Sequence, residues 1–224
     1  ALKMHGGCRL GDVGCEDLAS LEKGFPNLDK HIDNIRAFGV PLVVAINHFQ
    51  ADTLREIEAV REHCRRLGVR CALSDVFERG GEGGQELADQ VMDILDSERP
   101  DFRFLYDLDM PLKDKIEAIA TRMYGAARVE YETAAQRHLR IIESSKMSNL
   151  MVCMAKTQLS LTDKPEMKGA PQGWELTVRE IFVSAGSGFV VPICGRIMLI
   201  PGLPSQPSAM NVDIDGEGKI TGLY

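Results

Sequence analysis

The sequence predicts a doubly wound α/β layer with a parallel sheet, followed by a smaller α+β unit. Two observations predict the layer: strand, loop and helix signals repeat twice, and the first strand signal is a continuous apolar run. After residue 110 the order changes to helices followed by short strand signals punctuated by Gly and Pro. We therefore divide the chain into residues 1–25, the tail of a preceding domain; 26–110, the layer; and 111–224, the smaller unit.

The first helix of the layer is predicted to begin after a capping Asn27 and to end at Gly39. Its apolar face is formed at helical spacing by Leu28, Ile32, Ile35 and Phe38. The strand that follows covers residues 40–46 and reads PLVVAI without polar alternation. Such a run is typical of a parallel strand that is covered on both faces.

The second helix begins at a capping box formed by Thr53 and Glu56 and ends at Gly68. A short strand follows over residues 69–73, and then the glycine-rich loop SDVFERGGEGG. A third helix ends near Pro100. Its predicted inner face consists of Leu87, Val91, Ile94 and Leu95.

Two aromatic residues follow the two strands at equivalent places. Phe49 and Phe77 lie two or three residues past their strand ends, in the loops that lead into helices. Ligands of doubly wound layers bind at this edge, so the two rings are placed to clamp a flat heterocycle. The alternative is that each ring plugs the end of the sheet, and the sequence leaves both interpretations open.

The second unit is predicted to begin with a helix that follows Pro111 and ends at Gly125, and a further helix covers residues 131–145. Strands are predicted in LMVCMAKT, WELTVREIFVSA and GFVVPICGRIMLI. DIDGEG begins like a calcium loop, but it has no distal Glu and therefore predicts a hairpin turn.

Composition excludes several functions. Acidic residues outnumber basic residues by 33 to 26, which argues against nucleic acid as a partner. No apolar run approaches the roughly 18 residues of a membrane helix, so no membrane partner is expected and a cytoplasmic protein is predicted. The six cysteines have no C-x-x-C spacing and predict reduced, mostly buried thiols, with Cys153 in an apolar run.

Several other segments have two interpretations. GGEGG and SAGSGF are each a ligand-contacting loop or a tight backbone turn. Lys156 and Thr157 end a strand, where they face a phosphate across a domain boundary or form a surface ion pair. His5, beside two glycines, is a candidate functional residue, whereas His31 and His138 are predicted surface or packing residues and Trp174 a packing residue.

Motifs dispersed over the whole chain resemble the C-terminal part of the formate–tetrahydrofolate ligases. They occur in the same order: ALKMHGG, EKGFPNLDKHI, AINHF with DT, GGEGG, LYDLDMPLKDKIEAIA, MYGA, NLMVCMAKTQLSL, GAPQGW, SAGSGF, MLIPGLPSQP and DGEGKITGLY. The resemblance implies that formate is phosphorylated by ATP with Mg²⁺ and that the formyl group passes to N10 of tetrahydrofolate, the second substrate. It also implies a monovalent cation and a homotetramer.

The resemblance further implies a P-loop NTPase-like layer, incomplete at its N-terminus, with residues 26–110 as the C-terminal half of the nucleotide- and folate-binding domain. The chain contains no G-x-x-x-x-G-K-S/T sequence, so the P-loop portion is expected to precede Ala1 as a missing partner. We therefore expect no catalytic residue and no metal ligand in this chain, and no ligase activity from it alone. The alternative is a non-catalytic ligase-derived domain with an oligomeric or structural role.

The family's folate-binding residues correspond to Phe49, Phe77 and Leu73, with the pterin stacked between the two rings. Asn47, at the strand end, is a candidate nucleotide-binding residue. Phe77 stands where bacterial members usually have Trp, and Gln50 where a proline is common. Phe offers a smaller ring surface than Trp and has no N–H donor.

Overall fold

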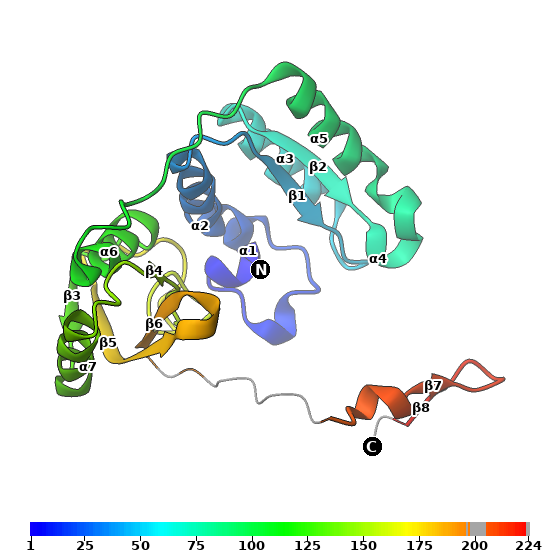
Figure 1. The fold of residues 1–224 in the computed structure, drawn as a ribbon. Coiled ribbons are helices and arrows are strands. Elements are labelled where there is room, and N and C mark those ends of the chain that lie inside the picture. The colour runs from blue at the N-terminus through cyan, green and yellow to red at the C-terminus, as the bar shows by residue number, and fades with distance from the viewer. Residues whose placement is uncertain (196, 198–204, 223–224) are drawn as a thin grey trace.

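The computed structural model describes residues 1–195, 197 and 205–222 of the 224-residue chain (Figure 1). It is a mixed α/β structure with parallel and mixed sheets. The elements of its first hundred residues are α1 (Leu2–His5), η1 (Leu10–Asp12), α2 (Leu18–Ala37), β1 (Val43–Asn47), α3 (Leu54–Arg66), β2 (Arg70–Ser74), α4 (Val76–Arg79), η2 (Gly80–Gly84) and α5 (Gln85–Ser97).

The first long helix begins ten residues earlier than predicted, so Asn27 as its N-cap is wrong. The cap is Asp17, whose carboxylate accepts a hydrogen bond from the Ser20 amide at 2.9 Å. Pro26 lies inside α2, where it removes one backbone donor without ending the helix. Asn27 is buried instead, and its side chain donates to the carbonyl of Gly169 in the second unit at 2.8 Å. The predicted domain boundary at residue 25 falls inside α2, and the boundary stays a prediction.

The two strands of the layer pair in parallel, with Val43 opposite Arg70 and Asn47 opposite Ser74. Val44 and Ile46 pack against a buried cluster between α2 and α3. Ala45 and Asn47 alternate with them and are exposed, so the prediction that this strand is covered on both faces is wrong. Helix α5 packs mainly against β2, where Ala72 is buried, and contacts β1 less, so that Ala45 stays exposed (Figure 1).

The inner face predicted for α5 is only partly buried. Ile94 is 8 % exposed, whereas Val91 and Leu95 are 41 % and 60 % exposed. The reason is that a two-stranded sheet is too narrow to cover the whole apolar stripe of a helix of 13 residues. The prediction is therefore wrong for Val91 and Leu95 in this chain.

The second unit contains a mixed four-stranded sheet with the order β3-β5-β6-β4. Its elements are α6 (Leu112–Ala118), one π-helical turn η3 (Ile119–Met123), β3 (Arg128–Tyr131), α7 (Thr133–Ser144), β4 (Met151–Val152), β5 (Glu175–Ser184), η4 (Ala185–Ser187) and β6 (Phe189–Cys194). The predicted helix ending at Gly125 is confirmed as α6 with η3, and α7 confirms the next. Strand β3 was not predicted, because four residues give too short an alternation.

The core of the second unit lies between its sheet and α6, η3 and α7. Sixteen buried residues form it, including Leu176 and Val178 at 0 % exposure. Trp174 is 6 % exposed within this cluster, which confirms its packing role. Lys115 is fully buried beside it, where its ammonium donates to the carbonyls of Leu108, Ser148 and Leu150.

The C-terminal turn is a hairpin as predicted. β7 (Asp213–Ile214) and β8 (Ile220–Thr221) pair antiparallel, preceded by η5 (Ser208–Asn211). The Asp215 carboxylate accepts from the amides of Glu217 and Lys219 and so stabilises the turn. SAGSGF forms the turn between β5 and β6. The predicted strand GFVVPICGRIMLI is confirmed over β6, and residues 196 and 198–204, including most of MLIPGLPSQP, lie outside the described residues.

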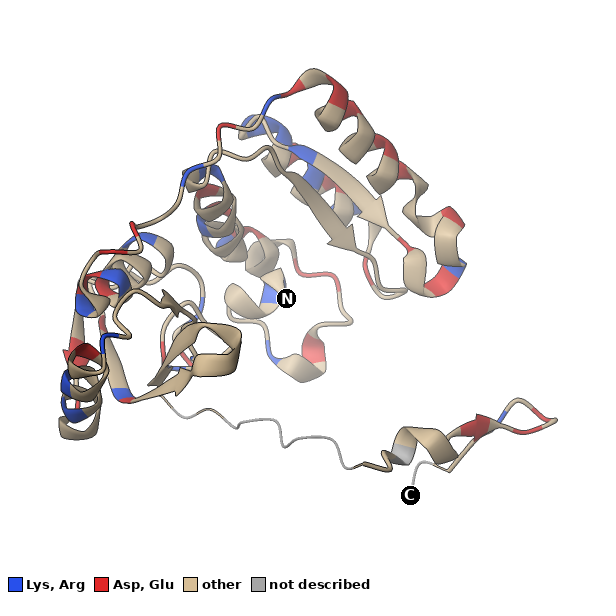
Figure 2. Ribbon diagram, viewed as in Figure 1, with Lys and Arg blue, Asp and Glu red and all other residues tan. Residues whose placement is uncertain are grey.

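The thiols and charges complete the description. All six cysteines are free, but Cys153 is exposed and only Cys64 and Cys194 are buried, so the prediction of mostly buried thiols is wrong. Basic and acidic residues are interspersed over both units, except on α5, which bears only acidic charges (Figure 2). No helix of the described residues has the length and apolar composition needed to cross a membrane.

Candidate functional site

The candidate site lies at the carboxyl ends of β1 and β2. The parallel register continues one residue past β1, where the amide of His48 donates to the carbonyl of Ser74 at 3.0 Å. The loop after β1 and helix α4 after β2 therefore begin side by side at one edge of the sheet (Figure 1). This is the edge at which ligands of parallel α/β layers bind.

Phe49 and Phe77 are both exposed at this edge. Phe49 is 63 % exposed and Phe77 is 89 % exposed. A ring that plugged the end of the sheet would bury most of its surface, so the exposure argues against that alternative for both residues. Among the described aromatic pairs, Phe49 and Phe77 do not stack on each other.

Two polar contacts join the loop of Phe49 to the segment of Phe77. His48 Nδ1 lies 3.1 Å from a carboxylate oxygen of Asp75, and both side chains are mostly buried. Gln50 Nε2 donates to Glu78 Oε1 at 3.0 Å. Because Gln50 and Glu78 directly follow the two aromatic residues, this contact brings the two ring-bearing segments together.

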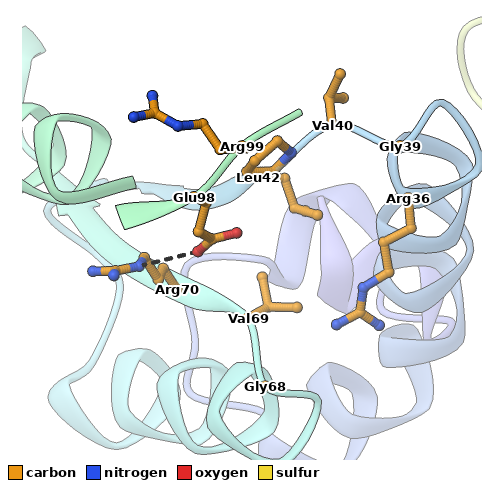
Figure 3. Close-up of a pocket in the computed structure, with 10 residues that line it drawn as sticks. Arg36, Gly39, Val40, Leu42, Gly68, Val69, Arg70, Glu98 and Arg99 are labelled. Atoms are coloured by element: carbon orange, nitrogen blue, oxygen red, sulfur yellow. Dashed lines mark ion pairs between the residues drawn. The ribbon is translucent and has the colours of Figure 1, made fainter. Parts of the chain in front are cut away.

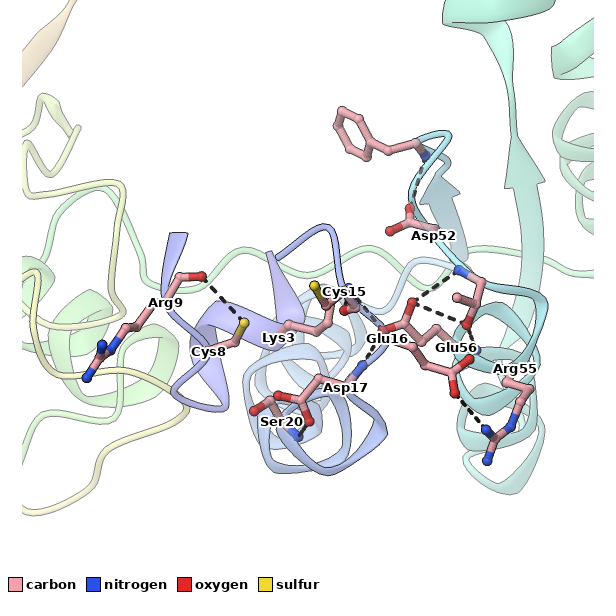
Figure 4. Close-up of polar contacts among 12 residues, drawn as sticks. Lys3, Cys8, Arg9, Cys15, Glu16, Asp17, Ser20, Asp52, Arg55 and Glu56 are labelled. Atoms are coloured by element: carbon pink, nitrogen blue, oxygen red, sulfur yellow. Dashed lines mark hydrogen bonds and ion pairs between the residues drawn. The ribbon is translucent and has the colours of Figure 1, made fainter. Parts of the chain in front are cut away.

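The loop after β1 is also fixed from within. The Phe49 amide donates to the Asp52 carboxylate at 3.0 Å, and the Asp52 amide donates to the Phe49 carbonyl at 2.8 Å (Figure 4). The predicted capping box then begins α3, with Thr53 and Glu56 each accepting from the other's amide. Phe49 is thus held between a strand end and a capped helix.

Glu56 connects this cap to the N-terminal segment. Its carboxylate lies 2.9 Å from the Lys3 ammonium and accepts from the Asp17 amide at 2.9 Å, with Lys3 and Glu56 only 8 % and 4 % exposed (Figure 4). Burial alone would raise the pKa of this carboxyl group. The hydrogen bonds from Asp17, Lys3 and Thr53 outweigh burial, so the pKa of Glu56 is lowered.

The glycine-rich loop has a structural role. The Asp75 amide donates to the Gly83 carbonyl at 2.9 Å, which folds η2 back onto the end of β2. A Cβ atom at Gly83 would lie 2.2 Å from the Asp75 carbonyl oxygen, so only glycine fits there. Gly80 has a φ of 57°, which also favours glycine. GGEGG therefore forms a tight turn that positions Asp75, and ligand contact by this loop stays a prediction.

The other two predicted site residues lie close to the rings. Leu73 is half-buried in β2, opposite Ile46, and Asn47 is exposed at the last position of β1. The contact of His48 with Asp75 and the contact of Gln50 with Glu78 were not predicted from the sequence. Their signal is a polar residue directly beside each predicted aromatic residue, which would have indicated contacts between the two loops.

Two cavities of about 320 Å³ each lie away from this edge. One lies at the amino ends of the strands and is lined by Arg36, Arg70, Glu98 and Arg99, with Arg70 3.9 Å from Glu98 (Figure 3). The other contains His5 and Lys156 from the sequence analysis and lies between the two units. Lys156 has no carboxylate partner among the described residues, so its interpretation as a surface ion pair is wrong.

The described part of the chain holds no group of three or more His, Cys, Asp and Glu residues that is arranged to bind a metal ion. The arrangement at the strand ends instead offers two ring faces, a half-buried leucine and an imidazole–carboxylate pair. It is suited to holding a flat ligand.

One comparison with known proteins bears on the chemistry of that ligand. A family model described as formate–tetrahydrofolate ligase matches residues 1–224, the whole chain.

Proposed function

Because the chain belongs to the formate–tetrahydrofolate ligase family, we propose that Phe49 and Phe77 stack the pterin of tetrahydrofolate between them. Members of this family join formate to tetrahydrofolate with ATP. In this proposal Leu73 packs against the edge of the bound ring. The carbon–nitrogen bond forms at the folate, and this chain contributes the site that holds it.

The exposure of the two rings is the observation that carries the proposal. An exposed phenylalanine gains nothing for folding, whereas a heterocycle between two such rings desolvates both faces. The contacts from His48 to Asp75 and from Gln50 to Glu78 support it, because they set the spacing of the two segments before a ligand arrives. Pre-organisation of this kind lowers the entropy cost of binding.

The triphosphate does not find a matching site in the described residues. GGEGG is used to fold η2 onto Asp75, and it lacks the lysine and the hydroxyl group that handle β- and γ-phosphates. We therefore assign no phosphoryl-transfer step to any residue of this chain. A nucleotide contact at Asn47, Mg²⁺, the monovalent cation, the P-loop partner, the tetramer and the cytoplasmic location stay predictions.

The test is tetrahydrofolate binding by the wild-type chain and by Phe49→Ala and Phe77→Ala. Loss of one stacking face is worth about 1–3 kcal/mol for a nucleobase, so each variant is expected to bind at least about fivefold more weakly. Phe104→Ala is the matched control, because Phe104 is 79 % exposed but lies outside both loops. Fluorescence or calorimetric titration gives the affinities.

The competing function is a non-catalytic domain that binds no folate. If wild type and both loop variants bind tetrahydrofolate equally, or if none binds it, the pterin site is elsewhere and that alternative is favoured. Unequal binding with normal unfolding curves for all three variants supports the pterin site.

A further inference from the structure

The cavity between the two units is lined by residues that the proposed folate site does not use. It is lined from α1 and α2 on one side and from η3 and the segment after β4 on the other. Its volume is about 320 Å³. The residues that line it are His5, Asn27, His31, Asn34, Ile119, Met123, Tyr124, Lys156, Gln158, Ser160 and Leu161. None of them belongs to the loops of Phe49 and Phe77.

Three basic groups face this cavity, and no carboxylate lines it. His5 comes from α1, His31 from α2 and Lys156 from the segment after β4. The Lys156 ammonium donates to the carbonyls of Thr157 and Ser160 and lies 4.7 Å from the centre of the Tyr124 ring. These neutral partners orient the ammonium, which forms no ion pair with a carboxylate of the described residues.

The electrostatics of the three groups agree with this description. Burial lowers the pKa of His31, and the positive charges of Lys156 and Lys30 lower it further. Burial and the charge of Lys168 lower the pKa of His5. Near Lys156 the opposing groups are Cys194 and Asp163, which raise its pKa but do not overcome the effect of burial. An anion in the cavity would favour protonation of the two imidazoles and so raise their pKa values.

Two polar atoms also await a partner. The Asn34 amide nitrogen donates to the Met123 carbonyl at 2.8 Å, but its carbonyl oxygen Oδ1 is buried and accepts from no described group. His5 Nδ1 accepts from the Gly169 amide at 3.2 Å, so the proton of the neutral ring is on Nε2, which is free to donate. A ligand with one donor, for Asn34 Oδ1, and one or more acceptors, for His5 Nε2, would satisfy both atoms.

The cavity at the amino ends of the strands is a useful contrast, because it has the same volume and more arginines. There, Arg70 lies 3.3 Å from Asp93 and 3.9 Å from Glu98, and Arg36 donates to the Leu67 carbonyl. Its charge is therefore partly neutralised by carboxylates of the same chain. Of these two cavities in the described part of the chain, the one between the units gathers several basic groups without a lining acid.

We propose that the cavity between the two units binds a small organic anion. The charged group lies against His5, His31 and Lys156, and an apolar part lies against Ile119, Met123 and Leu161. A volume of about 320 Å³ is at the lower end of the range of small-molecule sites and is larger than an inorganic phosphate requires. The anionic group is a carboxylate or a phosphate ester on a ring or short chain.

The experiment titrates the protein with phenyl phosphate, with benzoate and with uncharged benzyl alcohol. We expect one of the two anions to bind at least tenfold more tightly than benzyl alcohol, and the stronger one identifies the charged group. We also expect the His31 ring to titrate at higher pH when the anion is bound, as followed by NMR. Absence of saturable binding by both anions, or equal binding of benzyl alcohol, overturns the proposal.

Variants locate the site. His31→Gln removes one basic group from an exposed position that makes no hydrogen bond to a described residue, so it is expected to fold and to weaken anion binding about tenfold. Lys156→Met is expected to weaken anion binding more than His31→Gln does. Lys23→Gln, an exposed position on the same helix outside the cavity, is the control. An unchanged affinity in His31→Gln, with normal folding, places the anion elsewhere and contradicts the proposal.

Discussion

Among the described residues of the second unit, sixteen buried side chains form one core, whereas the cluster between α2 and α3 of the first unit buries four. The first unit exposes large apolar side chains near the carboxyl edge of its sheet and on α5: Phe49, Leu54, Val76, Phe77, Val91, Met92 and Leu95. The second unit also exposes some, including Ile141 and Phe182. The difference separates two uses of apolar residues. In the second unit the residues of the large core stabilise the fold, and in the first unit many exposed ones at the sheet edge and on α5 are available for contact with another molecule.

The largest expected effect tests the stabilising half of this comparison. Leu176→Ala removes a side chain with 0 % exposure from the second core, and it is expected to lower the free energy of unfolding by about 2–5 kcal/mol. Leu54→Ala is the matched change in the first unit, where Leu54 is 85 % exposed, and it should cost less than about 0.5 kcal/mol. Urea unfolding measures both, and similar losses would break the comparison.

A second effect concerns the buried ion pair that joins α1 to the cap of α3. Glu56→Gln leaves the Lys3 ammonium without its carboxylate, and we expect a loss of about 1–3 kcal/mol. Glu62→Gln is the control, because its ion pair with Arg65 is exposed and should contribute less than about 1 kcal/mol. Urea unfolding of the two variants, by equilibrium curves or by chevron kinetics, gives the two losses in the free energy of unfolding.

The same pair predicts a pH dependence with a definite sign. The folded pKa of Glu56 is lowered, so its contribution is fully present above the ordinary pKa of about 4.3 and is lost as the pH falls through the folded value. The wild type should therefore lose more stability than Glu56→Gln on acidification below about pH 4.5. Parallel curves for the two proteins would show that this carboxylate is not involved.

An effect of similar size tests the turn that positions Asp75. Gly83→Ala forces a Cβ atom against the Asp75 carbonyl oxygen and should cost about 1–3 kcal/mol of stability. Gly81→Ala is the control, since no atom lies within 4 Å of a Cβ placed there. We expect limited proteolysis to cut the loop faster only in Gly83→Ala, and equal rates would contradict the role of Gly83.

The smallest expected effect tests whether the exposed aromatic residues of the first unit serve for contact with a ligand. Phe77→Trp enlarges an exposed ring and should raise the affinity for tetrahydrofolate about two- to fivefold, because the stacked area grows. The free energy of unfolding should change by less than about 0.5 kcal/mol, since Phe77 is 89 % exposed. A titration beside an unfolding curve tests both statements, and a stability change without an affinity change would assign Phe77 to packing.

Much of the first unit could be predicted from its sequence, because its signals are local. The capping box at Thr53 and the glycine end of α3 each depend on residues within one or two turns. The start of α2 could not be predicted, because Pro26 usually marks a helix start and here lies inside the helix. What holds α2 together across Pro26 is packing against α1 and α3, which is not local.

The candidate site could be predicted only in outline. Two parallel strand ends and an aromatic residue after each were enough to place Phe49 and Phe77 at one edge. The contacts of His48 with Asp75 and of Gln50 with Glu78 join residues 27 and 28 positions apart, and their pairing depends on the register of the sheet. The cavity at His31 depends on the packing of two units, which no local pattern encodes.

The hydrogen bond from Gln50 to Glu78 has a consequence for how the site is held ready. The resembling ligases commonly have a proline after the first aromatic residue, and a proline restricts the unfolded chain as well as the folded loop. This chain replaces that covalent restriction by an exposed hydrogen bond, which water can exchange. The two segments are therefore held by a contact that can break and re-form, and not by a fixed backbone angle.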